Sequence, residues 1–212
     1  MKKIALALST LLMTACGSQT LPQAPQLRGA AQPNIQRLST PRATSAQSGL
    51  AIALDKVKQV DPSAQLYEID VWQEATGKSM HYGFLSNNQP DALRVIINAE
   101  NQQVSLINAP QGSQSQLINR DHWKIDSDAI YARAQQNGLR DTYYLATLWE
   151  NTWHISGLKQ DLYFQMDSQS GAIQLRCLGP YLNNCTDADG SPVQRLDSPG
   201  RQQHLQARQS AR

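Results

Sequence analysis

Two stretches of this 212-residue chain carry the same order of hydrophobic patterns, and this repetition limits the folds that the chain can adopt. Each stretch begins with apolar residues at helical spacing and continues with short segments in which apolar and polar residues alternate. Turn-forming residues, mainly Gly, Asn and Asp, separate the alternating segments. A helix followed by antiparallel strands predicts an α+β fold for each stretch.

The first stretch covers residues 48–107. Ser48 is expected to cap its helix, and Asp61-Pro62 is expected to end it, because the residue before a proline avoids the helical conformation. Apolar and polar residues then alternate as they do along a half-buried strand. The strands expected in this stretch occupy residues 66–72, 80–85, 93–98 and 104–106.

The second stretch covers residues 126–185 and follows a connector at residues 108–125. Asp126 or Ser127 is expected to cap its helix, and Gly138 stands where helices commonly end in a left-handed residue. The strands expected after this helix occupy residues 142–149, 152–156, 161–166 and 172–173. The elements fall in the same register in both stretches, which predicts a duplication.

A helix, three antiparallel strands and then the pattern Asp-x-x-x-Gly-x-Ile resemble the PepSY domain, a cystatin-like α+β module. The second stretch carries the pattern at Asp167, Gly171 and Ile173, whereas the first has Asn98 and Gln102 in place of the Asp and Gly. The resemblance implies two tandem PepSY-like units, each a helix with a three- or four-stranded antiparallel sheet. It also implies a non-catalytic module of peptidase propeptides and exported bacterial proteins, with a proposed role in modulating proteases.

The N-terminus has the layout of a secretory signal, with two lysines before a short apolar run. The run ends in Leu12-Met13-Thr14-Ala15-Cys16, which resembles the lipobox of bacterial lipoproteins. The resemblance implies that residues 1–15 are removed and that Cys16 carries the lipid that anchors the chain to a membrane. Gly17, rather than Asp, follows the cysteine, which in that family implies the outer membrane where the cell has one.

With Cys16 assigned to lipid, Cys177 and Cys185 remain as an even pair on either side of a turn-rich segment. Export would place this pair in an oxidising compartment, which predicts a disulfide. The alternative is half of a metal site. Zinc would need further ligands, and the histidines show no paired spacing to these cysteines.

Residues 16–47 and 186–212 contain no aromatic residue and are rich in polar residues, Ala and Pro. Such segments bury too little apolar surface to offset the entropy lost on ordering, so we expect a disordered tether and a disordered tail. Between them, residues 48–185 carry 10 basic and 14 acidic side chains. This acidic balance argues against a nucleic-acid-binding domain, which needs a concentrated basic face.

The sequence contains no nucleophile elbow, P-loop, dinucleotide fingerprint or His-Glu-x-x-His motif, so we expect neither an enzyme nor a bound cofactor or metal. Glu150 and His154 are four residues apart, but a hairpin is expected there, which favours an ordinary polar pair over metal ligands. Trp72, Trp149 and Trp153 lie on expected strands. They form either part of the core or an aromatic binding face.

These features predict a lipid-anchored, extracytoplasmic, PepSY-like binding or regulatory protein. It would present a sheet edge or face to a protein partner, such as an exported protease. Two alternatives remain: a structural envelope lipoprotein without protease contact, and a hydrolase with an unrecognised site that uses Glu150 and His154.

Overall fold

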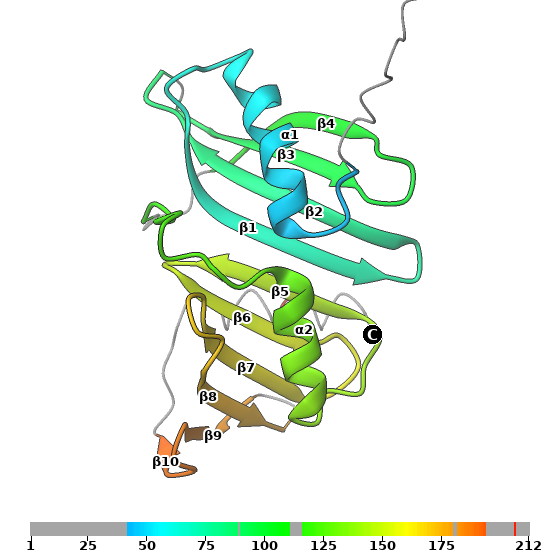
Figure 1. Cartoon of the computed structure of the whole chain (residues 1–212), viewed down its shortest axis with the longest axis vertical. Coiled ribbons are helices and arrows are strands. Elements are labelled where there is room, and N and C mark those ends of the chain that lie inside the picture. Colours follow the sequence, from blue (N-terminus) through cyan, green and yellow to red (C-terminus); the bar gives the residue numbers. More distant parts are fainter. Residues whose placement is uncertain (1–41, 89, 111–115, 180–181, 194–205, 207–212) are drawn as a thin grey trace, which may run out of the picture. The chain divides into compact units, whose positions relative to one another are not determined.

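The computed structural model describes residues 42–88, 90–110, 116–179, 182–193 and 206 (Figure 1). In this part of the chain, no helix is long and apolar enough to cross a membrane. The elements are α1 (Ala46–Lys58), β1 (Gln65–Glu74), β2 (Gly77–Leu85), β3 (Ala92–Asn98), β4 (Val104–Ala109), α2 (Ser127–Gln136), β5 (Tyr144–Trp149), β6 (Thr152–Gly157), β7 (Leu162–Asp167), β8 (Ile173–Leu178), β9 (Asn184–Asp187) and β10 (Pro192–Val193). The expected signal segment, Cys16, most of the expected tether and most of the expected tail lie outside the described residues.

Both helices begin at side chains that accept hydrogen bonds from free backbone N–H groups. Ser45 is the N-cap of α1, and it forms a capping box with Ser48, so the helix begins before the predicted start. Asp126, one of the two residues expected to cap the second helix, is the N-cap of α2. Gly138 follows the end of α2 with a φ of 105°, the left-handed conformation that the sequence indicated.

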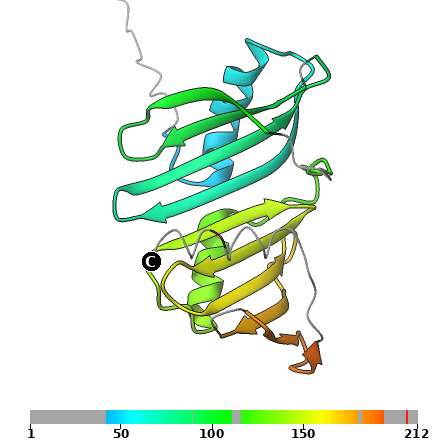
Figure 2. The same ribbon diagram turned by 180° about the vertical axis from the view of Figure 1, so that it is seen from behind.

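All ten strands form one antiparallel sheet in the order β10-β9-β8-β7-β6-β5-β1-β2-β3-β4. The strands of the first stretch meet those of the second where β1 pairs with β5, from Glu68 opposite Trp149 to Gln73 opposite Tyr144. Helices α1 and α2 lie on the same face of the sheet, as the views from front and back show (Figures 1 and 2). Their buried residues share one hydrophobic core with the strands beneath them.

The expected fold class, two tandem PepSY-like units of one helix and a separate sheet, is therefore wrong. In the part of the chain that the structure describes, the strands of both stretches belong to a single ten-stranded sheet, and α1 and α2 pack on it. An unpaired strand edge leaves backbone N–H and C=O groups without partners, and β1 and β5 satisfy each other's edges. Alternation of apolar and polar residues predicts that a strand exists, but it does not say which strand lies beside it.

The folded part also extends past the expected boundaries at both ends. Ala43 lies in the expected tether, yet it is fully buried. Its backbone N–H and C=O are hydrogen-bonded by the side chain of Gln102, at 2.8 and 3.0 Å. At the other end, β9 and β10 add two strands within and beyond the disulfide loop, in residues partly assigned to a disordered tail.

One carboxylate joins the N-termini of the two helices. Asp126 accepts hydrogen bonds from the backbone N–H of Ser127 in α2 at 2.7 Å and from the backbone N–H of Gln47 in α1 at 3.0 Å. It also accepts one from the hydroxyl of Ser45, the N-cap of α1. Because the N-terminus of a helix carries a partial positive charge, this single negative charge stabilises both helices.

Residues of the expected connector take part in the core. Trp123 lies edge-on to Trp153 of β6, with ring centroids 6.4 Å apart. Both indole N–H groups donate to the carbonyl oxygen of Ile125, each at 2.9 Å. The segment that leads into α2 is thus fixed against the sheet by two buried aromatic side chains.

Candidate binding face of the sheet

We call the sheet face opposite α1 and α2 the back face; Figure 2 shows the sheet from this side. The side chains on this face alternate along the strands with the residues of the main core, so they point away from the helices. The polar and aromatic residues on the back face include Glu68, Asp70, Trp72, His81, Arg94, Thr147, Trp149, His154, Tyr163 and Gln165.

A charged cluster occupies the back face across β1, β2, β3 and β5. The Arg94 Nη2 atom lies 2.7 Å from Glu68 Oε2, and Nη1 lies 3.9 Å from Asp70 Oδ2. The Thr147 hydroxyl donates to Asp70 Oδ1 at 2.8 Å. The side chain of Asp70 is 1% exposed, whereas that of Arg94 is 25% exposed. The cluster therefore reaches from the interior of the fold to solvent.

Gly83 permits this cluster to form. It stands opposite Glu68 on one side and Arg94 on the other, so the arginine reaches across β2 over a position without a side chain. A register shift between Leu66 and Glu68 brings Tyr67 against the same position. A Cβ atom on Gly83 would lie 2.8 Å from the Tyr67 ring, closer than real contacts allow.

Burial governs the protonation of the groups in and beside the cluster. Burial and the charge of Asp70 raise the pKa of Glu68, while Arg94 opposes that shift. Burial and the neighbouring Arg94 lower the pKa of His81 to about 4. Burial also lowers the pKa of His154 to about 4. Both imidazoles are therefore neutral at pH 7.

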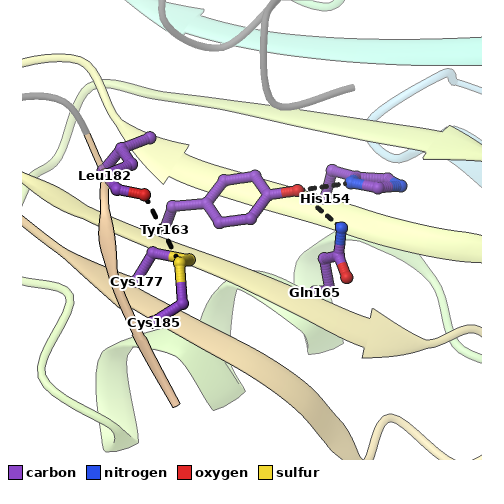
Figure 3. Close-up of a disulfide and its surroundings, with 6 residues drawn as sticks. All are labelled: His154, Tyr163, Gln165, Cys177, Leu182 and Cys185. Atoms are coloured by element: carbon purple, nitrogen blue, oxygen red, sulfur yellow. Dashed lines mark hydrogen bonds between the residues drawn. A yellow bond between two sulfur atoms is a disulfide. The ribbon is translucent and has the colours of Figure 1, made fainter. Parts of the chain in front are cut away.

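Aromatic side chains flank the cluster on the back face. The ring centroids of Trp72 and His81 are 6.4 Å apart, and those of Trp149 and His154 are 6.1 Å apart. The Nδ1 atom of His154 lies 2.7 Å from the Tyr163 hydroxyl, which also accepts a hydrogen bond from the Gln165 amide at 3.0 Å (Figure 3). A neutral imidazole pairs with the Tyr163 hydroxyl at Nδ1 in either tautomer, so these two hydrogen bonds hold this row of side chains in one orientation.

Two small hollows lie at opposite ends of the β1–β5 joint. One, of about 180 Å³, is lined by Trp149, Glu150, Thr152, His154, Gln165 and Gln174. The other, of about 270 Å³, is lined by Glu74, Ala75, Thr76, Tyr143, Leu158 and Lys159. Both are smaller than the roughly 300–1,000 Å³ of ordinary small-molecule sites, so each is better suited to one or two side chains of a protein partner.

The structure separates the three tryptophans that the sequence grouped as a possible binding face. Trp72 and Trp149 lie on the back face and are partly exposed, whereas Trp153 points the other way and is 0% exposed in the main core. Glu150 and His154 line the same hollow, but the Nδ1 hydrogen bond of the imidazole goes to Tyr163.

The predicted Cys177–Cys185 disulfide is present and joins opposed residues of β8 and β9 (Figure 3). It belongs to a small second cluster of buried residues on the back face with Tyr163, Leu175 and Leu182. Among the described residues, no group of three or more His, Cys, Asp or Glu side chains could hold a metal ion. Cys16, the predicted lipidation site, lies outside the described residues.

The charged cluster is the part of this face that sequence analysis missed. Glu68 and Asp70 are two residues apart and so share one face of a strand, which is the signal that the sequence contained. Their partners Arg94 and Thr147 come from strands far along the chain. Only the pairing of β1 with β2 and β5 brings these residues together.

Comparisons with known proteins place the chain in no family. No family model matches it, and no curated protein matches it. A solved structure that is similar in part is that of a protein from Clostridium difficile 630 described as a "putative lipoprotein". Its TM-score is 0.42 at 9% sequence identity, and the match covers 58% of this chain and 88% of that chain. The PepSY resemblance therefore has no support from a family match.

Proposed function

We propose that this chain is a lipid-anchored, extracytoplasmic binding protein that contacts an exported protein through the back face of its sheet. The observation that carries the proposal is the placement of Trp72 and Trp149 on either side of the Glu68–Arg94–Asp70 cluster. Tryptophan and arginine are the side chains most enriched at the energetic centres of protein interfaces.

The chemistry of this face favours recognition of a protein. The two partly exposed indoles would supply apolar contact area, and Arg94 would orient a polar group of the partner. The two hollows lie at either end of the same joint, where a partner's side chains would enter. Shallow aromatic surfaces with small hollows are typical of protein contacts, whereas substrates usually occupy deeper cavities.

Binding, rather than catalysis, is the mode of action that we propose. A general base works best with a pKa near the operating pH, and burial lowers the pKa of His154 to about 4. Its Nδ1 atom is also engaged by Tyr163. These two features disfavour the hydrolase that would use Glu150 and His154. An exported protease, the partner class that the sequence resemblance implied, is the narrower form of the proposal.

The anchor in this proposal is the lipid that the lipobox-like segment would place on Cys16. One acyl chain binds a membrane only marginally, whereas two or more hold a protein firmly, because each buried CH₂ contributes about 0.8 kcal/mol. We expect wild-type chain to sediment with membranes and Cys16→Ser to appear in the soluble or unprocessed fraction. Equal sedimentation of both forms would contradict the anchor.

The partner contact is tested by site-specific photocrosslinking in intact cells that express the full chain. A photoreactive residue at Thr152, which lies opposite Trp149 and lines the adjoining hollow, should give a discrete adduct, whereas the same residue at Val60, a 50% exposed position just beyond α1, should not. Trp72→Ala in the Thr152 probe should lower the adduct yield at least tenfold, as loss of a hot-spot residue does. The same adduct from both probe positions, or a yield unaffected by Trp72→Ala, would contradict the proposal.

The protease hypothesis is tested separately with the purified chain. Proteases recovered in the adduct, or secreted proteases of the same cells, should lose activity as the wild-type chain is added. The Trp72→Ala, Trp149→Ala chain should inhibit at least tenfold less. An adduct formed with a protein that is not a protease would keep the binding proposal and contradict the protease hypothesis.

A further inference from the structure

The strand β4 forms one end of the sheet. Within the described residues it pairs with β3 alone, from Ala92 opposite Ala109 to Ile97 opposite Val104. In an antiparallel pair, successive residues of a strand direct their backbone N–H and C=O groups alternately toward the neighbouring strand and away from it. The hydrogen bond from the Asn98 N–H to the Gln103 carbonyl shows that Gln103, and hence every second residue after it, is directed toward β3. The backbone N–H and C=O groups of Val104, Leu106 and Asn108 therefore point away from β3, toward the outside of the sheet.

The β4 edge lacks the features by which sheet edges usually avoid pairing with other chains. Its sequence, Val-Ser-Leu-Ile-Asn-Ala, contains no charged residue and no proline. Its pairing with β3 runs without a register shift, so no bulge twists the edge away. Ile107 is 45% exposed on it. These properties describe an edge on which another strand can pair.

The opposite edge of the same sheet is protected. Its last strand, β10, has two residues, one of which is Pro192, which cannot donate a ladder hydrogen bond. The strand beside it, β9, is tied to β8 by the Cys177–Cys185 disulfide and ends at Asp187. A short strand, a proline and a nearby charge all discourage pairing. The two edges therefore differ in kind, and only β4 is suited to pairing.

We propose that β4 pairs antiparallel with β4 of a second copy of this chain, about a two-fold axis at Leu106. In that register Leu106 faces Leu106 of the partner copy, and Val104 faces Asn108. On the back face Ser105 faces Ile107, so each exposed isoleucine lies beside a small side chain. The outward backbone N–H and C=O groups of Val104, Leu106 and Asn108 in each copy would then be hydrogen-bonded to those of the other copy.

Two observations favour a second copy as the occupant. In a two-fold pair of identical strands, any charge near the axis meets its own copy, and β4 carries no charge that would repel. The molecule also already joins two strands from different stretches in this manner, since β1 and β5 pair antiparallel across six residues without a connecting turn. The proposed contact would extend the same sheet through a second such joint.

The dimer should be weak in solution. A single strand pair of this length buries well under the roughly 800 Å² per partner that stable complexes bury. Attachment of both copies to one membrane would raise their effective concentration and favour the pair. This contact is separate from the proposed partner site around Trp72 and Trp149, so either proposal can fail without the other.

Cysteine crosslinking of the full chain in detergent micelles tests the register. A chain carrying Ser105→Cys is mixed with a chain carrying Ile107→Cys under mild oxidation. Because these positions face each other across the axis, we expect at least tenfold more crosslinked dimer from the mixture than from either variant alone. A chain carrying Val60→Cys, treated in the same way, is the control for crosslinks formed by random collision. Equal yields from the mixture, the single variants and the control would overturn the proposal.

A second measurement detects the dimer without new cysteines. Sedimentation of the wild-type chain over a range of concentrations should show a reversible dimer. Ile107→Lys, which places two lysines near the axis, should weaken it at least tenfold, whereas Val60→Lys should not. Circular dichroism establishes that both variants are folded. A wild-type chain that stays monomeric at every concentration and on vesicles, or a dimer that Ile107→Lys leaves intact, would overturn the proposal.

Discussion

The carboxylate of Asp126 should contribute more to stability than an ordinary helix cap, because it serves both helices. It accepts backbone N–H bonds from Ser127 in α2 and from Gln47 in α1, and a hydroxyl bond from Ser45. In Asp126→Ala these three donors, and the Ser127 hydroxyl at 3.4 Å, lose their acceptor at once. The two helix N-termini also lose the negative charge that lies between them.

The expected magnitude follows from these contacts. Loss of a single N-cap costs about 1 kcal/mol, and each helix end loses a further 0.3–1 kcal/mol, roughly, of dipole interaction. The additional donors in α1 bring the expected total to about 3 kcal/mol, part of which water recovers. For a chain of this size, that corresponds to a decrease in Tm of about 6–12 °C.

Asp128 provides a matched control in the first turn of the same helix. Its side chain is 57% exposed and pairs with Lys78 at the surface, so Asp128→Ala should cost about 0.5 kcal/mol. Urea denaturation with the disulfide intact measures both free energies of unfolding. A double-mutant cycle with Ser45→Ala should show coupling to Asp126 of at least about 0.5 kcal/mol. Equal losses for the two aspartate variants, or no coupling, would refute the shared cap.

Three further predictions concern the back face and the disulfide. Gly83→Ala should destabilise the fold by about 1–3 kcal/mol in urea denaturation, because the new Cβ displaces a packed ring; wild-type stability would contradict this. Replacing both Cys177 and Cys185 by alanine should lower the free energy of unfolding by about 2.5 kcal/mol, the value that the loop-entropy model gives for a loop of this length. Urea denaturation measures this loss, and an unchanged urea midpoint would contradict a stabilising disulfide. The pKa of His154 is lowered to about 4, so the unfolded chain binds its proton first, and stability is lost as the pH falls from about 6.5 toward 4. Between pH 7 and pH 4 the free energy of unfolding should therefore fall by up to about 3 kcal/mol less in His154→Gln than in the wild-type chain, as measured by unfolding curves at both pH values. An identical pH dependence in the two chains would contradict a buried neutral imidazole.

Local sequence patterns predicted the secondary structure of this chain well. Periodicity placed both helices and seven strands close to their observed positions, because a half-buried strand or helix needs apolar residues at its own period. Of β8 (Ile173–Leu178) it indicated only the beginning, at residues 172–173. Asp126 and Gly138 were recognised as helix boundaries for the same local reason. The capping residue of α1 was misplaced by three positions, since Ser45 and Ser48 are both good caps and form one capping box.

The arrangement of these elements was not predictable in the same way. Two separate sheets and one continuous sheet need the same alternation in β1 and β5, so the pattern could not distinguish them. The tail strands β9 and β10 were missed because they are short and polar, and they form through pairing with β8 and through the disulfide. Trp153 could not be separated from Trp72 and Trp149 without knowing which face the helices cover.

The sequence by itself determined that two helices and most of the strands form, roughly where along the chain they lie, and which two cysteines near the C-terminus pair. These properties depend on residues that are neighbours in the chain. Tertiary structure alone decided that one sheet contains all ten strands, that Arg94 reaches Glu68 across Gly83, and that β4 is left at an edge. Each of these depends on which strands pair, and pairing is set by the burial of both sheet faces and the satisfaction of backbone hydrogen bonds over the whole molecule.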